Sequence, residues 1–435
     1  MKVLWLGSTP AGAAHILDFD YPGANWISSL EAYFKKVPEI KLAVGFFYKK
    51  HPEFKFSYDS VTYYPIESGV LTLKGRINQK IFNRLDSNTE GIKKVIEDFK
   101  PDIIQLFGTE TGLGDVVHLT DIPVIIHIQG LINPYLFAWF PKGINQTTLY
   151  SKSSLIDILA KKGILGNYYT FKNWAKREAN TIRNGKYFFG RTDWDRRVIN
   201  IYNNHCKYFH CDELLRPAFF ENQWHPNQAS TLKFVTTINP NIYKGIEIIL
   251  ETAFLLRKNT ELKFEWAVVG IEGNSQLVKL IEKIKKKKFN ENFVSFVGPK
   301  AGNDVIHELL KANIFIHPSH IDNSPNSVCE AMLLGMPIIA GNVGGVSSLV
   351  QHNENGILYN SHDPFELAGI ILEKKDKISE LKKLGDNARE TAYKRHDPKT
   401  IVSTLLNTYE QILSEKLYSQ AGSGTDQLQI APKKQ

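Results

Sequence analysis

Short apolar runs alternate with longer amphipathic segments along most of the chain. The apolar runs are continuous, which is typical of parallel strands covered on both faces. The longer segments repeat apolar residues at helical spacing; in residues 23–36, Trp26, Ile27, Leu30 and Phe34 fall on one helix face. This alternation of strands and helices predicts an α/β protein with doubly wound parallel sheets.

The pattern occurs twice along the chain. In the first half we expect strands at residues 3–6, 42–48, 103–107 and 122–128, and helices at 23–36 and 92–99. After residue 216 we expect strands at 232–238, 264–270, 294–297, 314–317 and 337–340, and helices at 245–257, 276–287, 304–310 and 326–334. Two Rossmann-like domains are therefore predicted, in residues 1–215 and 216–395.

The connecting and terminal segments differ from these domains in composition. Residues 216–230 contain two prolines, and we interpret them as the linker. Residues 364–413 have mostly helical periodicity, interrupted at residues 396–398. Residues 419–435 are rich in Gly, Ser, Gln and Lys and have little apolar surface, so we predict a disordered tail.

Composition and charge narrow the class of protein. The 435 residues are 43% hydrophobic and 23% charged, which is enough apolar surface for two or three folded domains. The net charge of +8 leaves phosphate-bearing ligands, nucleic acid and anionic membranes as partners. Three cysteines are too few for a disulfide framework, and no apolar run approaches the roughly 20 residues of a membrane span. The apolar run at 3–6 is shorter than that of a signal peptide, so we expect a cytoplasmic protein.

The loop after the first expected strand carries no nucleotide fingerprint. Residues 7–12 match neither the dinucleotide-binding pattern nor a P-loop, which argues against a dehydrogenase or an NTPase. Gly12 and Gly23 allow a ligand to approach the backbone, although turn glycines are the simpler interpretation.

Residues 317–337 combine a strand, a polar loop and a helix. Pro325 suits the start of a helix, and Ser324 or Ser327 could cap it. Free amides at the helix start and the helix dipole form an anion site suited to a diphosphate. The residues at this position are Pro325, Asn326, Ser327 and Val328.

Two carboxylates flank this helix start. Asp322 could hold sugar hydroxyls, and Glu330 could accept hydrogen bonds from the two vicinal hydroxyls of a ribose. Seven residues separate them, and Ala331-Met332, Gly335-Met336-Pro337 and Gly344-Gly345 follow. The arrangement resembles the donor-site motif of family-four retaining glycosyltransferases, which usually has Glu at both ends. The resemblance covers about residues 2–413 and is strong from 232 to 358.

A second family element is a lysine–glycine pair, here Lys244-Gly245. The resemblance implies that Lys244 neutralises the leaving diphosphate, where negative charge develops. The family usually has an Arg about five residues earlier, but this chain has Asn239. An amide cannot supply a bidentate cation, so another base is required; the candidates are Arg191, Arg196 and Lys300.

Further positions match the family in shape. Gly270 resembles its glycine turn after the second donor-domain strand, and residues 294–298, ending at Gly298, resemble the family strand that lies beside the nucleobase; ordinary turn glycines are the alternative. In the first half, Gln129 stands before Gly130, where the family often has His, and His127 lies two residues earlier. Residues two apart on a strand share a face, so either side chain could reach the cleft; a structural role for His127 is the alternative.

The resemblance implies a GT-B enzyme, with two Rossmann-like domains facing a central cleft. The second domain would bind a nucleotide-sugar donor and the first a glycan or lipid-linked acceptor, with residues 396–418 crossing back to the first domain. Transfer would proceed with retention at the anomeric carbon, without a metal or resident cofactor, since the nucleotide-sugar is a substrate. Asp322 would orient the sugar, Glu330 the ribose and Lys244 the diphosphate. Bacterial surface-polysaccharide synthesis is the setting that the resemblance suggests.

Residues 149–178 place six cations among aromatic residues. This composition favours either contact with an anionic membrane at its inner face or an ordinary amphipathic helix pair. No nucleic-acid module accompanies it, so we expect no nucleic-acid partner. His205-Cys206 and His210-Cys211 look like a metal repeat, but strand alternation sends neighbouring residues to opposite faces, which argues against zinc.

Two other functions stay open. One is another GT-B enzyme, such as a nucleotide-sugar epimerase, which would need further carboxylates and histidines in the cleft. The other is a catalytically weak nucleotide-sugar-binding protein, suggested by Asn239, Gln129 and Asp322, which depart from the family pattern.

Overall fold

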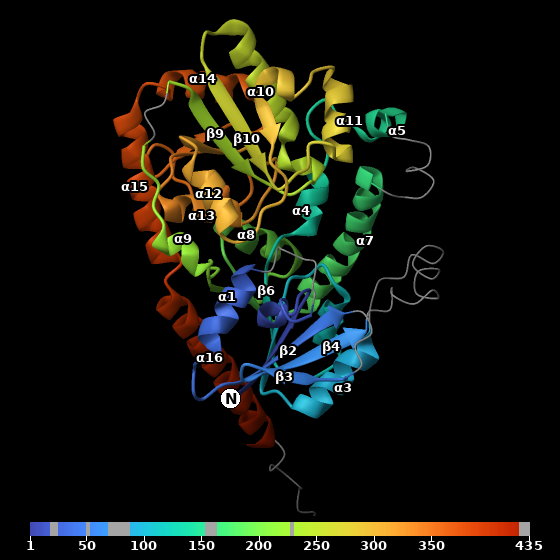
Figure 1. Ribbon diagram of the computed structural model, residues 1–435. Coiled ribbons are helices and arrows are strands. Elements are labelled where there is room, and N and C mark those ends of the chain that lie inside the picture. Colours follow the sequence, from blue (N-terminus) through green and yellow to red (C-terminus); the bar gives the residue numbers. More distant parts are fainter. Residues whose placement is uncertain (18–24, 49–52, 68–87, 153–162, 227–229, 426–435) are drawn as a thin grey trace, which may run out of the picture.

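The computed structural model contains two domains, each built on a mixed α/β layer arrangement (Figure 1). It describes the chain except residues 18–24, 49–52, 68–87, 153–162, 227–229 and 426–435. The two sheets lie in different halves of the molecule, and helices cover them. The expected doubly wound α/β architecture is confirmed.

The first domain contains an eight-stranded sheet of order β3-β4-β2-β1-β5-β6-β7-β8. Its strands are β1 (Lys2–Gly7), β2 (Lys41–Tyr48), β3 (Phe56–Tyr58), β4 (Val61–Glu67), β5 (Ile103–Phe107), β6 (Val124–His127), β7 (Tyr187–Gly190) and β8 (Lys207–His210). All neighbouring strands pair in parallel except β3 and β4, which are antiparallel. The central strand β1 is almost wholly buried, because helices cover both faces of the sheet.

The helices of this domain connect successive strands. They are α1 (Asn25–Phe34), α3 (Thr89–Phe99), α4 (Ile132–Phe137), α5 (Gln146–Lys152), α7 (Gly163–Asn184) and α8 (Asp193–Tyr202), with short 3-10 turns η1 (Ala11–Ala13) and η2 (Gly112–His118). The short helix α9 (Pro217–Glu221) follows β8 and packs into the core of the second domain. Local chemistry sets their ends. The Asn88 side chain caps α3 by accepting from the Gly91 amide, and Thr192 caps α8 by accepting from the Asp195 amide.

The second domain contains a six-stranded sheet of order β11-β10-β9-β12-β13-β14, parallel throughout. Its strands are β9 (Leu232–Thr237), β10 (Phe264–Val269), β11 (Val294–Phe296), β12 (Ile314–His317), β13 (Ile338–Gly341) and β14 (Ile357–Tyr359). Its helices are α10 (Ile246–Asn259), α11 (Gln276–Lys285), α12 (Asn303–Leu310), α13 (Asn326–Leu334), α14 (Pro364–Lys374) and α15 (Ile378–Arg395), with 3-10 turns η3 (Ile242–Lys244), η4 (Asn290–Asn292) and η5 (Val346–Ser348). The strand order changes direction between β9 and β12, which is where ligands bind in such sheets.

The last helix, α16 (Pro398–Thr425), leaves the second domain and packs against the first (Figure 1). Leu405, Tyr409 and Ile412 are buried in the same core as Val3 and Trp5 of β1. The helix runs to Thr425, so the prediction of a disordered tail is wrong for residues 419–425; residues 426–435 lie outside the described residues. A helix that is already nucleated by packing extends cheaply, because each further residue adds a backbone hydrogen bond.

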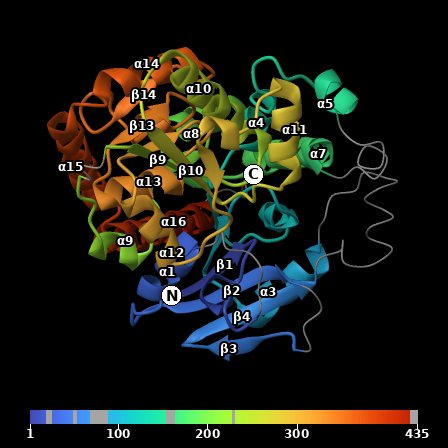
Figure 2. The same ribbon diagram turned by 45° about the horizontal axis from the view of Figure 1, so that its top comes forward.

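The segment singled out for membrane contact lies partly between the domains. Helices α4 and α7 stand beside α11 of the second domain in both Figure 1 and Figure 2. Tyr168 and Phe171 of α7 pack with Trp139 and with Tyr243 of the second domain. Within the described part of the chain, no helix combines the length and the apolar character needed to cross a bilayer.

Candidate active site

Lys244 and Asp322 meet at the carboxyl edge of the second sheet. Lys244 ends η3, which follows β9, and Asp322 lies in the loop after β12. These two strands are neighbours in the sheet, so the loops that follow them converge. The Lys244 Nζ lies 2.5 Å from Asp322 Oδ2, and Asp322 is only 6% exposed.

Asp322 has two further partners. The Tyr135 hydroxyl of α4, in the first domain, donates to Asp322 Oδ1 over 3.3 Å, and His317 Nε2 lies 3.4 Å from Oδ2. Burial alone would raise the pKa of Asp322, but the Lys244 ammonium and His317 hold that pKa well below its usual range. Burial lowers the pKa of His317, so the imidazole is neutral and Lys244 supplies the opposing charge. Asp322 is therefore ionised and oriented by groups from both domains.

Two glycines make this convergence of loops possible. Gly245 has φ +77°, and a Cβ there would lie 2.1 Å from the Pro318 carbonyl oxygen. Gly344 has φ +51°, and its Cβ would lie 1.9 Å from the carbonyl oxygen of Asp322. Only residues without a side chain fit these positions, because both the backbone conformation and the space exclude a Cβ.

The start of α13 differs from the predicted cap. Neither Ser324 nor Ser327 caps the helix, because the Ser324 hydroxyl donates instead to Glu213 over 2.7 Å. Pro325 has no N–H, and the Val328 amide donates to the Pro325 carbonyl. Two of the four predicted amides, those of Asn326 and Ser327, therefore remain as donors for an anion; both residues are half-buried.

Glu330 is held by Arg216, a residue of the predicted linker. Arg216 Nη2 donates to Glu330 Oε1 over 2.8 Å. Burial raises the pKa of Glu330, and the Arg216 guanidinium opposes that rise. No sequence signal marked this pairing, because 114 residues separate the partners.

The other predicted donor-site residues lie along the same edge. The Gly270 amide donates to the Gly298 carbonyl over 2.9 Å, so the ends of β10 and β11 are joined there. Asn239, at the end of β9, is exposed and accepts from the Asn241 side chain. The edge thus carries the whole predicted donor set: Lys244, Asp322, Glu330, Asn239, Gly270, Gly298 and the 324–328 segment.

The cations considered as substitutes for an Arg at position 239 lie in different surroundings. Arg191 is buried, donates to the Gln129 carbonyl, and its Nη1 lies 3.5 Å from Glu213 Oε2. Arg196 is paired with Asp193 at 3.1 Å. Lys300 is exposed in the loop after β11. The two arginines are already engaged by protein groups.

In the first domain, the predicted cleft residues lie in different surroundings. The Gly12 amide donates to Glu31, and the Gln129 side chain accepts from Trp26 Nε1 over 3.0 Å. His127 is fully buried among aromatic rings, so the expectation that it reaches the cleft is wrong in this structure. Burial among apolar groups disfavours the charged form of the imidazole, so His127 belongs to the core of the domain and not to the cleft. Gly23 lies outside the described residues.

One cluster in the described part of the chain has donor atoms that could hold a metal ion: Glu213, Cys329 and His396. Arg191 and Arg395 lie 3.5 and 3.7 Å from Glu213 Oε2 and hold the pKa of this buried carboxyl well below its usual range. Two guanidinium groups already neutralise the carboxylate, which disfavours a further cation there. In the discounted repeat, His210 pairs with Asp212, while Cys211 is buried.

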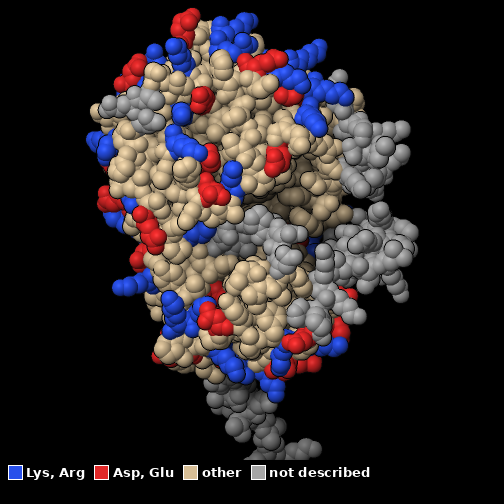
Figure 3. Space-filling model, viewed as in Figure 1, with Lys and Arg blue, Asp and Glu red and all other residues tan. Residues whose placement is uncertain are grey.

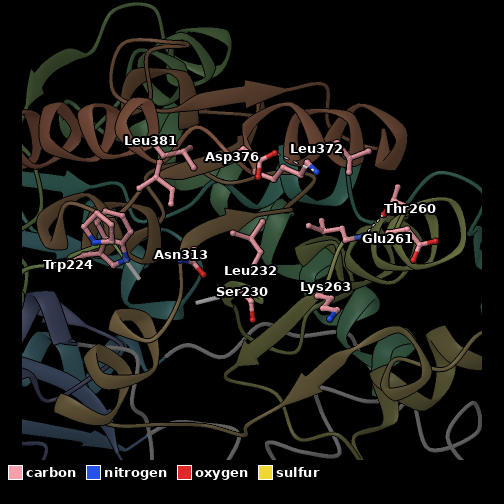
Figure 4. Close-up of a pocket in the computed structure, with 14 residues that line it drawn as sticks. Trp224, Ser230, Leu232, Thr260, Glu261, Lys263, Asn313, Leu372, Asp376 and Leu381 are labelled. Carbon is pink, nitrogen blue, oxygen red and sulfur yellow. Dashed lines mark hydrogen bonds and ion pairs between the residues drawn. The ribbon is translucent and has the colours of Figure 1, made fainter. Parts of the chain in front are cut away.

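A cavity of about 630 Å³ lies away from this site (Figure 4). Trp224, Leu232, Lys263 and Asn313 line it. Leu232 and Asn313 mark the amino ends of β9 and β12, so the cavity opens at the opposite edge of the sheet from Lys244.

On the face shown in Figure 3, positive and negative side chains are interspersed over both domains.

Known proteins resemble this chain in sequence and in fold. Residues 218–391 match the family model for glycosyl transferases group 1. The chain is 25% identical over 299 residues to an uncharacterized glycosyltransferase of Methanocaldococcus jannaschii, covering 66% of this chain and 78% of that protein. Seven further relatives are matched over 61% of their length or less.

Solved structures show the same fold. Sucrose-phosphate synthase from Thermosynechococcus elongatus superposes with a TM-score of 0.67 at 14% identity, covering 95% of this chain and 100% of that one. Anabaena HepE, solved in complex with UDP, superposes with a TM-score of 0.63 at 17% identity, covering 94% and 100%. The sequence match includes the edge that carries Lys244, Asp322 and Glu330. Residues 218–391 thus match the glycosyl transferases group 1, and the chain has the GT-B fold.

Proposed function

We propose that this glycosyltransferase moves a sugar, with retention at the anomeric carbon, from a nucleotide-sugar to a glycan or lipid-linked acceptor. The observation that carries the proposal is the meeting of Lys244, Asp322, Glu330 and the start of α13 at one sheet edge. A nucleotide-sugar needs these groups together, since it presents a ribose, a diphosphate and a sugar within a short distance.

Lys244 is suited to the leaving diphosphate. Its ammonium is the point charge nearest Asp322, and the donor amides of Asn326 and Ser327 lie at the positive end of the α13 dipole. Negative charge develops on the diphosphate as the glycosidic bond breaks, so these groups stabilise the transition state more than the ground state. The same groups would allow transfer without a metal ion.

Asp322 is suited to the sugar. It is ionised and acceptor-only, and Tyr135 and Lys244 hold its two oxygens. We propose that donor binding draws Lys244 toward the diphosphate and leaves Asp322 to accept from sugar hydroxyls. A front-face reaction, in which the leaving phosphate helps to deprotonate the acceptor, then needs no protein nucleophile.

We further propose that the first domain presents the acceptor at the inner face of a membrane, in bacterial surface-polysaccharide synthesis. Lys172 and Lys176 of α7 are exposed, and Phe137 at the end of α4 is 97% exposed. Exposed cations and an exposed aromatic ring suit an anionic lipid surface. Sedimentation with anionic and with zwitterionic vesicles tests this part of the proposal, which fails if the protein binds neither.

The donor is identified by a thermal-shift screen over UDP-, GDP- and ADP-sugars. A ligand at 100 times its dissociation constant adds about 2.7 kcal/mol of stability, which gives a clear rise in melting temperature. The anomeric configuration of the product, read by NMR, then tests retention.

Two substitutions test the site. Lys244→Ala should lower turnover by roughly 100- to 1,000-fold, because it removes charge stabilisation of the leaving group. Glu330→Ala should mainly raise the donor KM, because the ribose is held equally in ground and transition states. Lys279→Ala, an exposed lysine on α11, is the matched control and should leave turnover unchanged. Transfer that survives both site substitutions would show that the site is elsewhere.

The two alternative functions give different results in the same assay. An epimerase releases an altered sugar from the donor without any acceptor. A binding protein shows the thermal shift but no turnover.

A further inference from the structure

We infer that Arg216 is a positioning residue for the nucleotide: it holds Glu330 so that one carboxylate oxygen stays turned toward the ribose. The inference rests on the proposed function, since it concerns how the same site binds its donor. Arg216 lies outside the carboxylate motif and belongs to the segment between the domains.

The first supporting observation is the geometry of the pair. Arg216 Nη2 contacts Glu330 Oε1 at 2.8 Å, and the two side chains are 18% and 11% exposed. Among the described residues, no hydrogen bond to Glu330 Oε2 is found. One oxygen is thus fixed by a guanidinium, and the other remains to accept from a ribose hydroxyl.

The second observation is that the guanidinium itself is fixed. Arg216 stands at the amino end of α9, and its guanidinium lies over the ring of Phe219, 4.6 Å from the ring centre. Phe219 is fully buried in a core that includes Val328 and Cys329 of α13. Helix α9 therefore presents Arg216 to α13 on a rigid aromatic platform, which reduces the rotamer freedom lost on binding.

The third observation concerns charge. Glu330 is buried, and burial favours its protonated form. A protonated carboxyl loses acceptor capacity, and its acid proton would face the ribose hydroxyls as a donor. Arg216 is the charged group that opposes this rise in pKa, so it favours the ionised carboxylate and fixes its direction.

The test compares nucleotide binding with and without the ribose hydroxyls. Calorimetry measures the affinity of the full chain for UDP, ADP and GDP and for the 2′,3′-dideoxy form of each. The ratio of the affinity for a nucleotide to that for its dideoxy form gives the contribution of the ribose hydroxyls. We expect a ratio of about tenfold or more in the wild type, since a hydrogen bond to a charged group has this magnitude. In Arg216→Met, which keeps the aliphatic stem over Phe219, the ratio should fall toward one while dideoxy affinity is unchanged.

Four further variants sharpen the result. Glu330→Gln should lose the ratio by itself, and Arg216→Met added to it should change nothing more, as expected for residues that act through each other. Arg216→Lys should restore part of the ratio, which also covers the case in which Arg216→Met fails to fold. Arg197→Met removes an exposed arginine of α8 and is the control for charge.

The outcomes separate this inference from the proposed function. If the nucleotides bind and the ratio in both Arg216 variants equals that of the wild type, the positioning role is wrong and the proposed function stands. If none of the nucleotides binds the wild-type chain, both fail.

Discussion

At the scale of single residues, His127 shows how burial decides protonation. Its ring lies near those of Trp26, Phe107 and Phe189, and its Nδ1 lies 3.1 Å from the Gln105 amide nitrogen. Burial, assisted by the nearby Arg191 charge, lowers the pKa of His127 to about 3. The ring is therefore neutral in the folded protein at neutral pH.

This depressed pKa makes stability depend on pH. Below about pH 6.5 the unfolded chain binds a proton at His127, whereas the folded chain does not until about pH 3, so acidification favours unfolding. Between pH 7.5 and 5 the loss is about 2 kcal/mol from this group. We expect His127→Gln to show a shallower decline in urea-unfolding free energy than the wild type over this range.

The two proteins are compared by the change of their unfolding free energy with pH and not by its absolute value, because the substitution also changes packing. Exposed His225 provides the control, and His225→Gln should follow the wild-type profile. Parallel profiles for His127→Gln and the wild type would contradict the assignment of a neutral His127.

At the scale of elements, the junction of η3 and α10 places the lysine of the site. Gly245 forms the cap between them at φ +77°, and the His320 amide donates to the Tyr243 carbonyl over 2.8 Å. The loop after β12 therefore lies directly against the end of η3. Close backbone contact, rather than the Lys244 side chain alone, brings the ammonium within reach of Asp322.

Gly245→Ala should disturb this contact. The new Cβ would meet the Pro318 carbonyl at 2.1 Å in a left-handed backbone conformation, which costs about 1–3 kcal/mol. We expect a lower melting temperature and a lower kcat, since Lys244 must shift away from Asp322. The control is Gly369→Ala within α14, where a Cβ meets nothing within 4 Å and should stabilise the helix slightly. Unchanged kcat in Gly245→Ala would contradict the role of this contact.

At the scale of the whole molecule, a buried polar network joins the two domains. Arg395, at the end of α15, donates to the Arg191 carbonyl and lies 2.5 Å from Asp212. Thr192 of the first domain donates to the Asn323 side chain over 2.6 Å, next to Asp322. The relative position of the domains is therefore set by hydrogen-bonded groups that would lose their partners on separation.

Helix α16 makes the first domain depend on the end of the chain. Leu405 is fully buried in the core beside β1, so Leu405→Ala should cost about 2–5 kcal/mol through lost packing and a cavity. The unfolding transition should shift accordingly, measured by urea denaturation. Leu417→Ala, at a position 68% exposed on the same helix, should be nearly neutral. Equal effects of the two substitutions would contradict packing of α16 on the first domain.

The sequence by itself was sufficient for the two α/β domains, because strands buried on both faces leave continuous apolar runs. It did not show β3, β4, β7 or β14. Three of these contain only three or four residues, and β4 contains Pro65, which argues against a strand. Such segments become strands because a neighbouring strand supplies hydrogen-bond partners, and that information is not local.

The same division holds at the site. Sequence alone predicted Asp322, Glu330 and the start of α13 as site residues from a local motif, and it predicted Lys244 from the family resemblance. Only the tertiary structure decided that Lys244 pairs with Asp322 across 78 residues, Arg216 with Glu330 across 114, and Tyr135 with Asp322 across 187. It also turned Ser324 from the helix cap toward Glu213 and buried His127. Burial and the choice between competing partners depend on which segments the fold brings together.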